Sequence, residues 1–152
     1  MRLRDILDQK SHEVRTITSH ATCDDVVSEL VRYNIGSLIV RDAPGGPVLG
    51  IITERDVLKA LAADQLPLAQ LKVAKFMTRT LISARPEDDI MEAMRLMTTH
   101  RVRHLPVIED DELNGLLSIG DIVKAQHDEL VAENHHMRSY IQGGSGSSVV
   151  PL

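Results

Sequence analysis

The sequence predicts an α/β protein made of two similar halves, each with the order β-α-β-β-α. A motif of glycine, two aliphatic residues, a hydroxyl residue and an aspartate three positions later occurs twice, as GIITERD (50–56) and GLLSIGD (115–121). Short aliphatic strands and helix-period apolar stripes surround both copies. The halves superpose with an offset of 67 residues up to Val40 and Val107, and of 65 afterwards. The chain therefore contains an internal duplication.

The first half begins with an expected short amphipathic helix over 2–9. Its apolar residues Leu3, Ile6 and Leu7 share one helical face, so we expect the helix to dock on a later part of the chain. The remaining elements follow in order: a strand over 13–18, a helix over 21–33, a strand over 37–40, a turn over 42–47, a strand over 48–52 and a helix from Thr53.

After a connector over 64–72 the order repeats. The expected elements are a strand over 80–83, a helix from Pro86, strands over 104–108 and 113–117 around a turn at 109–112, and a helix from Ser118 to about Ile141. One small repeat cannot cover so long a helix, so we expect part of it to pack on a second copy. The predicted boundaries are 1–66 for the first repeat with its N-terminal helix, 67–142 for the second repeat with its extended C-terminal helix, and 143–152 for a flexible tail.

Composition excludes several classes of protein. The 152 residues carry a net charge of −5 without a cationic cluster, which argues against a nucleic-acid partner. Cys23 is the only cysteine, so no internal disulfide can form. There is no apolar run of about 18–20 residues and no signal-peptide core, so we expect a soluble, cytoplasmic protein without a membrane partner. Neither a metal-ligand pattern nor a catalytic motif is present, and we predict a protein that is not an enzyme.

The repeated motif has two interpretations. In the first, Thr53 and Ser118 cap the helices that follow, and Asp56 and Asp121 bond back to the cap residues. In the second, the helix N-termini attract phosphate and the aspartates accept from ribose hydroxyls. A single copy would favour the cap, and the repetition shifts the balance towards a ligand site.

Together the halves resemble the tandem cystathionine-β-synthase (CBS) domain family, in the paired arrangement called a Bateman module. The resemblance covers about residues 1–142 and rests on the two motifs, on NIGSLIV (34–40) and on RVRHLPV (101–107). The closing helix looks like that of the stand-alone two-domain subgroup. The resemblance implies two repeats packed sheet against sheet around a pseudo-twofold axis, with two clefts that can hold adenine nucleotides and no catalytic cofactor.

The resemblance also implies which residues line each cleft. One cleft would be made from Leu116, Ser118, Asp121, Lys10, Arg15, Gly36 and Ser37. The other would be made from Ile51, Thr53, Asp56, Met77, Ile82 and His104.

The two clefts are predicted to be unequal. Where the first repeat has Gly36-Ser37, the second has Arg103-His104, and an arginine offers a fork of donors that suits phosphate. The stronger site is expected to combine Ser118 and Asp121 with Lys10, Arg103 and His104. The cleft of Thr53 and Asp56 is expected to be weaker, empty or assisted by Arg55.

The predicted function is non-catalytic sensing of AMP, ADP, ATP or NAD(H), with S-adenosylmethionine as a further candidate that Arg103 disfavours. A ligand between the repeats would favour one relative orientation and so alter the surface shown to a regulated partner, whose identity the sequence leaves open. Two chains are expected to associate through their helices into a flat homodimer. The alternative is a constitutive dimeric interaction module with empty clefts.

Overall fold

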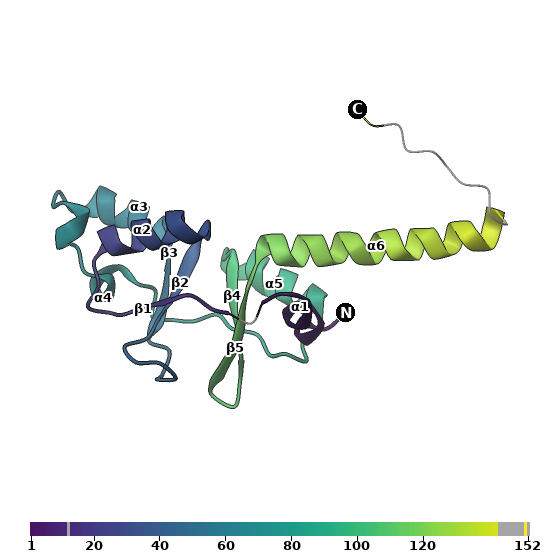
Figure 1. The fold of residues 1–152 in the computed structure, drawn as a ribbon, viewed down its shortest axis with the longest axis horizontal. Helices are drawn as coiled ribbons and strands as arrows, with labels where there is room; N and C mark the ends of the chain where they lie inside the picture. The colour runs from purple at the N-terminus through teal and green to yellow at the C-terminus, as the bar shows by residue number, and fades with distance from the viewer. Residues whose placement is uncertain (12, 143–150, 152) are drawn as a thin grey trace.

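The computed structural model describes residues 1–11, 13–142 and 151, and its elements follow the predicted order except for one strand of the second half (Figure 1). The first half contains β1 (Thr16–Ile17), α2 (Cys23–Tyr33), β2 (Ser37–Val40), β3 (Gly50–Thr53) and α3 (Glu54–Ala63). The second contains α5 (Ile90–His100), β4 (His104–Glu109), β5 (Glu112–Ser118) and α6 (Ile119–Gln142). The helix α1 (Leu3–Gln9) precedes the first half, and the 3₁₀-helix η1 (Leu68–Gln70) and α4 (Val73–Phe76) connect the two. The predicted flexible tail lies outside the described residues, apart from Pro151.

Two small sheets lie side by side in the middle of the molecule (Figure 1). In the first, β2 pairs in parallel with β1 and antiparallel with β3. In the second, β4 pairs antiparallel with β5 across a two-residue turn, Asp110-Asp111, in which both residues have positive φ. The predicted α/β fold of two similar repeats is confirmed, because each half has a helix, an antiparallel strand pair and a second helix in the same order.

The expected strand over 80–83 is absent, and this prediction was wrong. In the first half Ile39 N–H donates to Arg15 O at 3.1 Å, which joins β1 to β2. The matching position in the second half is Pro106, which has no N–H to give to Ile82. Only a single parallel bridge, Ala84 with Val107, remains where β1 has its counterpart.

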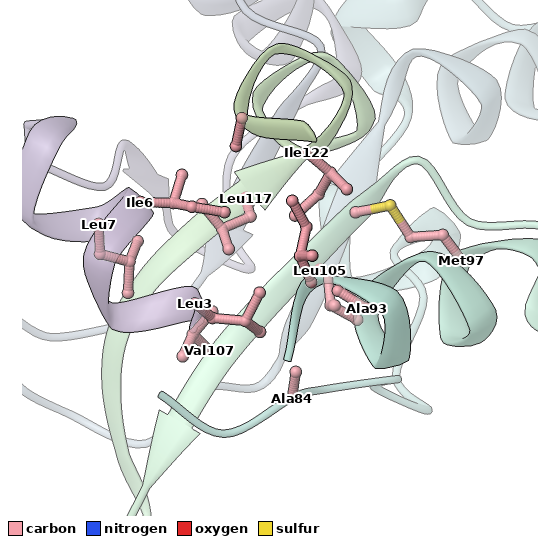
Figure 2. Packing of buried hydrophobic residues seen from close by; sticks show 12 residues of the cluster. Leu3, Ile6, Leu7, Ala84, Ala93, Met97, Leu105, Val107, Leu117 and Ile122 are labelled. Atoms are coloured by element: carbon pink, nitrogen blue, oxygen red, sulfur yellow. The ribbon is translucent and has the colours of Figure 1, made fainter. Parts of the chain in front are cut away.

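The two halves exchange helices between their main hydrophobic cores. The helix α1 buries Leu3, Ile6 and Leu7 among residues of β4, β5, α5 and α6 in the second half, so the prediction that it docks on a later part of the chain is confirmed (Figure 2). In return, Val73 of α4 and the following Met77 pack into the core of the first half. Each fully buried aliphatic side chain contributes about 1.5–3 kcal/mol, so the exchange binds the halves together by several kcal/mol. The boundary at residue 66 separates the two repeats in sequence, but α1 packs on the second half and α4 packs on the first.

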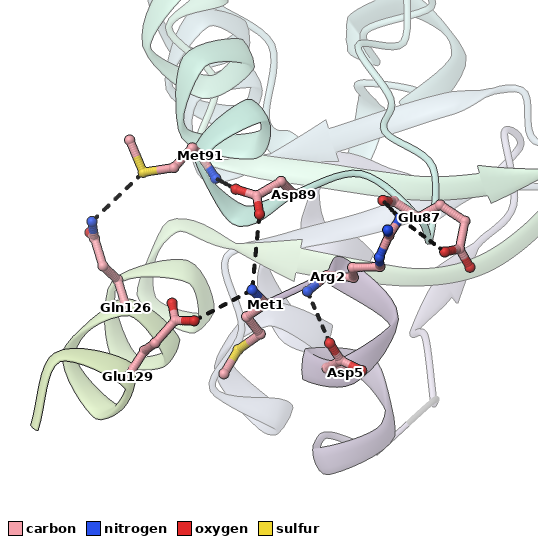
Figure 3. Close-up of polar contacts among 8 residues, drawn as sticks. All are labelled: Met1, Arg2, Asp5, Glu87, Asp89, Met91, Gln126 and Glu129. Carbon is pink, nitrogen blue, oxygen red and sulfur yellow. Dashed lines mark hydrogen bonds and ion pairs between the residues drawn. The ribbon is translucent and has the colours of Figure 1, made fainter. Parts of the chain in front are cut away.

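Polar contacts of Met1 and Arg2, just before α1, tie the N-terminus to the segment that leads into α5 and to the middle of α6 (Figure 3). The Met1 amine lies 3.4 Å from Glu129 Oε1 and 3.9 Å from Asp89 Oδ2, and the Arg2 guanidinium donates to Glu87 O at 2.8 Å. Such exposed pairs contribute little free energy, so they orient a helix that its apolar face stabilises. Of the helices described, none combines the length and the apolar character needed to cross a membrane.

Candidate functional site

The second copy of the motif forms a reciprocal hydrogen-bonded pair where β5 ends and α6 begins. Ser118 N–H donates to Asp121 Oδ2 at 2.8 Å, and Asp121 N–H donates to Ser118 Oγ at 3.2 Å. This is a capping box, which satisfies backbone donors of the first helical turn. The cap therefore exists, and it also holds a hydroxyl and a carboxylate at the positive end of a 24-residue helix.

Lys10, which follows α1, reaches into this pair. Its ammonium donates to Asp121 Oδ2 at 2.7 Å and to Leu116 O at 3.0 Å. The structure thus brings together Lys10, Leu116, Ser118 and Asp121, which we name the Ser118 site. Its side chains are within reach of solvent, since Lys10 is 39% and Asp121 26% exposed.

The carboxylate of the Ser118 site is charged at neutral pH. Partial burial acts to raise the pKa of Asp121, but the hydrogen bonds from Lys10 and from Ser118 N–H outweigh it and hold the pKa below its usual range. Both bonds go to Oδ2, and Asp121 Oδ1 accepts no hydrogen bond from the residues that the structure describes. The site therefore offers one ammonium and one open carboxylate oxygen.

The first copy of the motif has the same backbone hydrogen bonds, but a different side chain contacts its aspartate. Asp56 Oδ2 accepts from Thr53 N–H at 3.0 Å, and Thr78 Oγ1 donates to Asp56 Oδ1 at 3.2 Å. The backbone of Thr78 also pairs with Ile51 in both directions, and Met77 beside it is buried. We name Ile51, Thr53, Asp56 and Thr78 the Thr53 site. Asp56 is only 7% exposed there, and both of its oxygens have partners within the chain.

His104 stands where the two halves meet. A Cβ placed on Gly36 would lie 3.0 Å from His104 Cε1 and 3.6 Å from Glu54 Oε1, so the imidazole and the Glu54 carboxylate both approach the Gly36 backbone. Burial lowers the pKa of His104, and the positive charges of Lys10 and Arg103 act in the same direction, while Glu54 and Asp121 oppose them. His104 is therefore neutral at pH 7 and lies within electrostatic reach of the Ser118 site.

The other predicted residues take varied positions. The Arg15 guanidinium lies 3.7 Å from the centroid of the Tyr33 ring and 3.2 Å from Glu13, and these contacts do not involve Ser118 or Asp121. Ser37 is buried in β2 opposite Thr53, and Ile82 packs at the edge of the second core. The Arg103 side chain is exposed and forms no hydrogen bond or ion pair with the part of the chain that the structure describes.

Two residues of these sites were missed from the sequence. Thr78 completes the Thr53 site, and Glu54 faces His104 across the junction. Extending the 67-residue offset by one position beyond Lys10 and Met77 aligns Ser11 with Thr78, and this would have pointed to Thr78. Glu54 lies inside the first motif, but its counterpart is Ile119, so the repeat carries no signal for it.

A surface hollow of about 600 Å³ lies in the second half, away from both motifs. Its charged lining residues are four acids, Asp88, Glu92, Asp110 and Asp111, and one base, Arg85. This acidic lining would repel a phosphate, so the hollow is not a candidate for the predicted nucleotide. Among the described residues, no group of three or more histidine, cysteine or acidic side chains is arranged to hold a metal ion.

Comparison with known proteins identifies the repeated unit. The CBS domain profile matches residues 3–63 and 73–128. The chain is 38% identical over 130 residues to the mitochondrial CBS domain-containing protein CBSX3 of Arabidopsis thaliana, covering 84% of this chain but less than two thirds, 63%, of that protein. It is 26% identical over 121 residues to the CBS domain-containing protein YhcV of Bacillus subtilis, covering 80% of this chain and 84% of that one.

A solved structure agrees with this assignment. The CBS-domain containing protein ATU1752 from Agrobacterium tumefaciens superposes with a TM-score of 0.79 at 36% identity, covering 83% of this chain and 99% of that one. The profile, the relatives and the fold all concern the same two halves. This chain belongs to the CBS domain family and carries two CBS domains in tandem.

Proposed function

We propose that the chain is a non-catalytic regulatory module that binds an adenine nucleotide, AMP, ADP, ATP or NAD(H), at the Ser118 site. Tandem CBS modules are typically regulatory. The observation that carries the proposal is the placement of the Lys10 ammonium 2.7 Å from Asp121, beside the Ser118 hydroxyl and the N-terminus of α6. A phosphate needs cationic and hydrogen-bond donors, and a ribose needs an acceptor for its hydroxyls. This site supplies both kinds of group.

The bound ligand would redistribute the contacts of Lys10. Its phosphate would accept from the Ser118 hydroxyl, from the first-turn N–H groups of α6 and from Lys10, with Arg103 as a second cation. Asp121 would accept from ribose through Oδ1, the oxygen without a partner among the described residues. Lys10 would then exchange part of its contact with Asp121 for the phosphate, so binding replaces one charge pair by another.

Signalling would proceed through the junction of the halves. The His104 side chain lies close to Gly36, and Arg103 immediately precedes β4. A ligand held by Arg103 and Lys10 would therefore favour one arrangement of this junction, and the populations of the two arrangements would shift by the difference in ligand affinity. The surface altered in this way would be presented to a regulated protein, by a homodimer that packs through its helices.

Isothermal titration calorimetry of the full chain tests the proposal with AMP, ADP, ATP, NAD, NADH and S-adenosylmethionine. The informative variant is Asp121→Asn, which keeps the shape of the side chain and removes its charge. The matched control is Asp56→Asn in the Thr53 site. At about 100 times the Kd, a ligand should also add roughly 2.7 kcal/mol to the free energy of unfolding.

The expected result is that at least one nucleotide binds the parent, that Asp121→Asn weakens it and that Asp56→Asn retains it. Loss of binding in Asp56→Asn alone would move the function to the Thr53 site. Absence of binding by every compound would overturn the proposal and favour the constitutive interaction module.

A further inference from the structure

The second part of α6 extends beyond the body of the molecule with its apolar side chains exposed (Figure 1). Ile122 and Ala125 are buried against the second core, but every side chain from Leu130 to Ile141 is exposed. Leu130, Met137 and Ile141 are 54%, 67% and 81% exposed, respectively. A helical segment this short is marginal in water by itself, so a packing partner for this face would stabilise it.

The exposed residues follow a heptad repeat. Val123, Leu130 and Met137 are seven residues apart, and each is followed four residues later by His127, Asn134 or Ile141. This spacing places the first set at d positions and the second set at a positions of a coiled coil. The resulting stripe turns away from the buried Ile122 and Ala125, so the body of the same chain does not cover it.

We propose that residues 123–141 of α6 pair with the same residues of a second copy as a parallel, in-register, two-stranded coiled coil. In this arrangement the charged residues that flank the stripe on one helix face residues of opposite charge on the other. Glu133 is at a g position and Arg138 at the next e position, so each Glu133 faces Arg138 of the second copy. An antiparallel pair would instead bring e positions together, and two of these, Lys124 and Arg138, are cationic.

Asn134 sets the register of the pair. A lone asparagine at an a position pairs with the asparagine of the facing helix and penalises shifted or higher-order arrangements, at some cost in stability. Two heptads hold weakly alone, and the tandem CBS bodies would lie at one end of the pair. This pairing does not depend on nucleotide binding.

Disulfide trapping tests the orientation and the register together. Asn134→Cys and Ile141→Cys place a thiol at two a positions, where facing Cα atoms of a parallel pair are within disulfide range. The matched controls, Ala132→Cys and Ser139→Cys, lie at exposed f positions on the outside of the pair. Native Cys23 is fully buried with a raised pKa, so it contributes little background.

Under mild oxidation of the full-length variants, the expected result is a covalent dimer for both a-position variants and monomer for both controls. Adding Leu130→Glu to Ile141→Cys should abolish the link while the Tm of the body stays unchanged. A dimer from Asn134→Cys without one from Ile141→Cys would overturn the parallel orientation. Monomer throughout, or equal linking of the controls, would overturn the coiled coil.

Discussion

The Ser118 and Thr53 sites share one backbone frame and differ in what the chain places against it. In both, a hydroxyl residue at a strand end and an aspartate in the next helical turn form a capping box. In the Ser118 site the aspartate accepts a hydrogen bond from Lys10, whereas in the Thr53 site it accepts one from Thr78. The first contact leaves an exposed charged pair, and the second leaves a buried carboxylate with both oxygens occupied.

This difference shows that one repeated backbone motif can have two different surroundings in the same chain. The capping box supplies stability in either half, and under the proposed function the segment arriving from the other half would decide whether a ligand can compete for it. Thr78 joins the Thr53 site through its hydroxyl and through two backbone hydrogen bonds to Ile51. A nucleotide would have to displace all of these there, but only the Lys10 contact at the Ser118 site.

The largest expected effect is on stability and concerns the aspartates. Asp56→Ala should lower the free energy of unfolding by about 2 kcal/mol, because it removes the cap and the buried carboxylate that accepts from Thr53 and Thr78. Asp121→Ala should cost only about 1 kcal/mol, because water can solvate the groups it frees. Urea unfolding of both variants measures the difference. Equal losses would show that the two sites are equally closed.

A smaller effect is expected when the Ser118 site is made to resemble the Thr53 site. Lys10→Met introduces the residue found at the matching position, Met77. It should weaken nucleotide binding by about tenfold, or 1.4 kcal/mol, which is the scale of one charged hydrogen bond. Calorimetry with the best ligand measures this loss. Lys59→Met on α3 removes the same charge from an exposed position and should leave the affinity unchanged. A similar loss of affinity in that variant would show that the effect comes from the net charge of the protein and not from the Ser118 site.

Most of the fold could be predicted because each element carries a local signal. The apolar stripes of α2 and α5, the aliphatic strands and the repeated motif all follow periodicities that single segments reveal. The prediction of a strand over 80–83 was wrong because a strand forms only when a neighbouring strand can hydrogen-bond to it. Its own sequence suits a strand, and Pro106, 24 residues away, removes the donor it needs.

The sites could be predicted only in part for the same reason. The pairing of Ser118 with Asp121 is local and follows from their spacing. The meeting of Lys10 with Asp121 came from the family resemblance, and the structure reproduces it at 2.7 Å. Thr78 contacts Asp56 through long-range packing that only the repeat offset hints at, and the position of Glu54 beside His104 depends on how the two halves meet. The binding roles of all these residues stay predictions.

The smallest expected effect is a pH dependence that only one half can produce. His104 occupies the position of Ser37, so the junction has a titratable group on one side and a hydroxyl on the other. Because burial lowers the pKa of His104 in the folded protein, the unfolded chain takes up a proton first as the pH falls. Stability is then complete above the unfolded pKa of about 6.5 and declines as the pH falls below it.

The variant His104→Asn should flatten this decline between about pH 7.5 and 5.5, whereas His136→Asn, an exposed residue outside the heptad stripe of α6, should leave it unchanged. Asp121 does not confuse the measurement, because its lowered pKa moves its own contribution to more acidic solutions. Urea midpoints at a series of pH values give the slopes directly. An identical slope in parent and His104→Asn would mean that the junction is open enough to hydrate a charged imidazole. Protonation of His104 would then not distinguish the two halves.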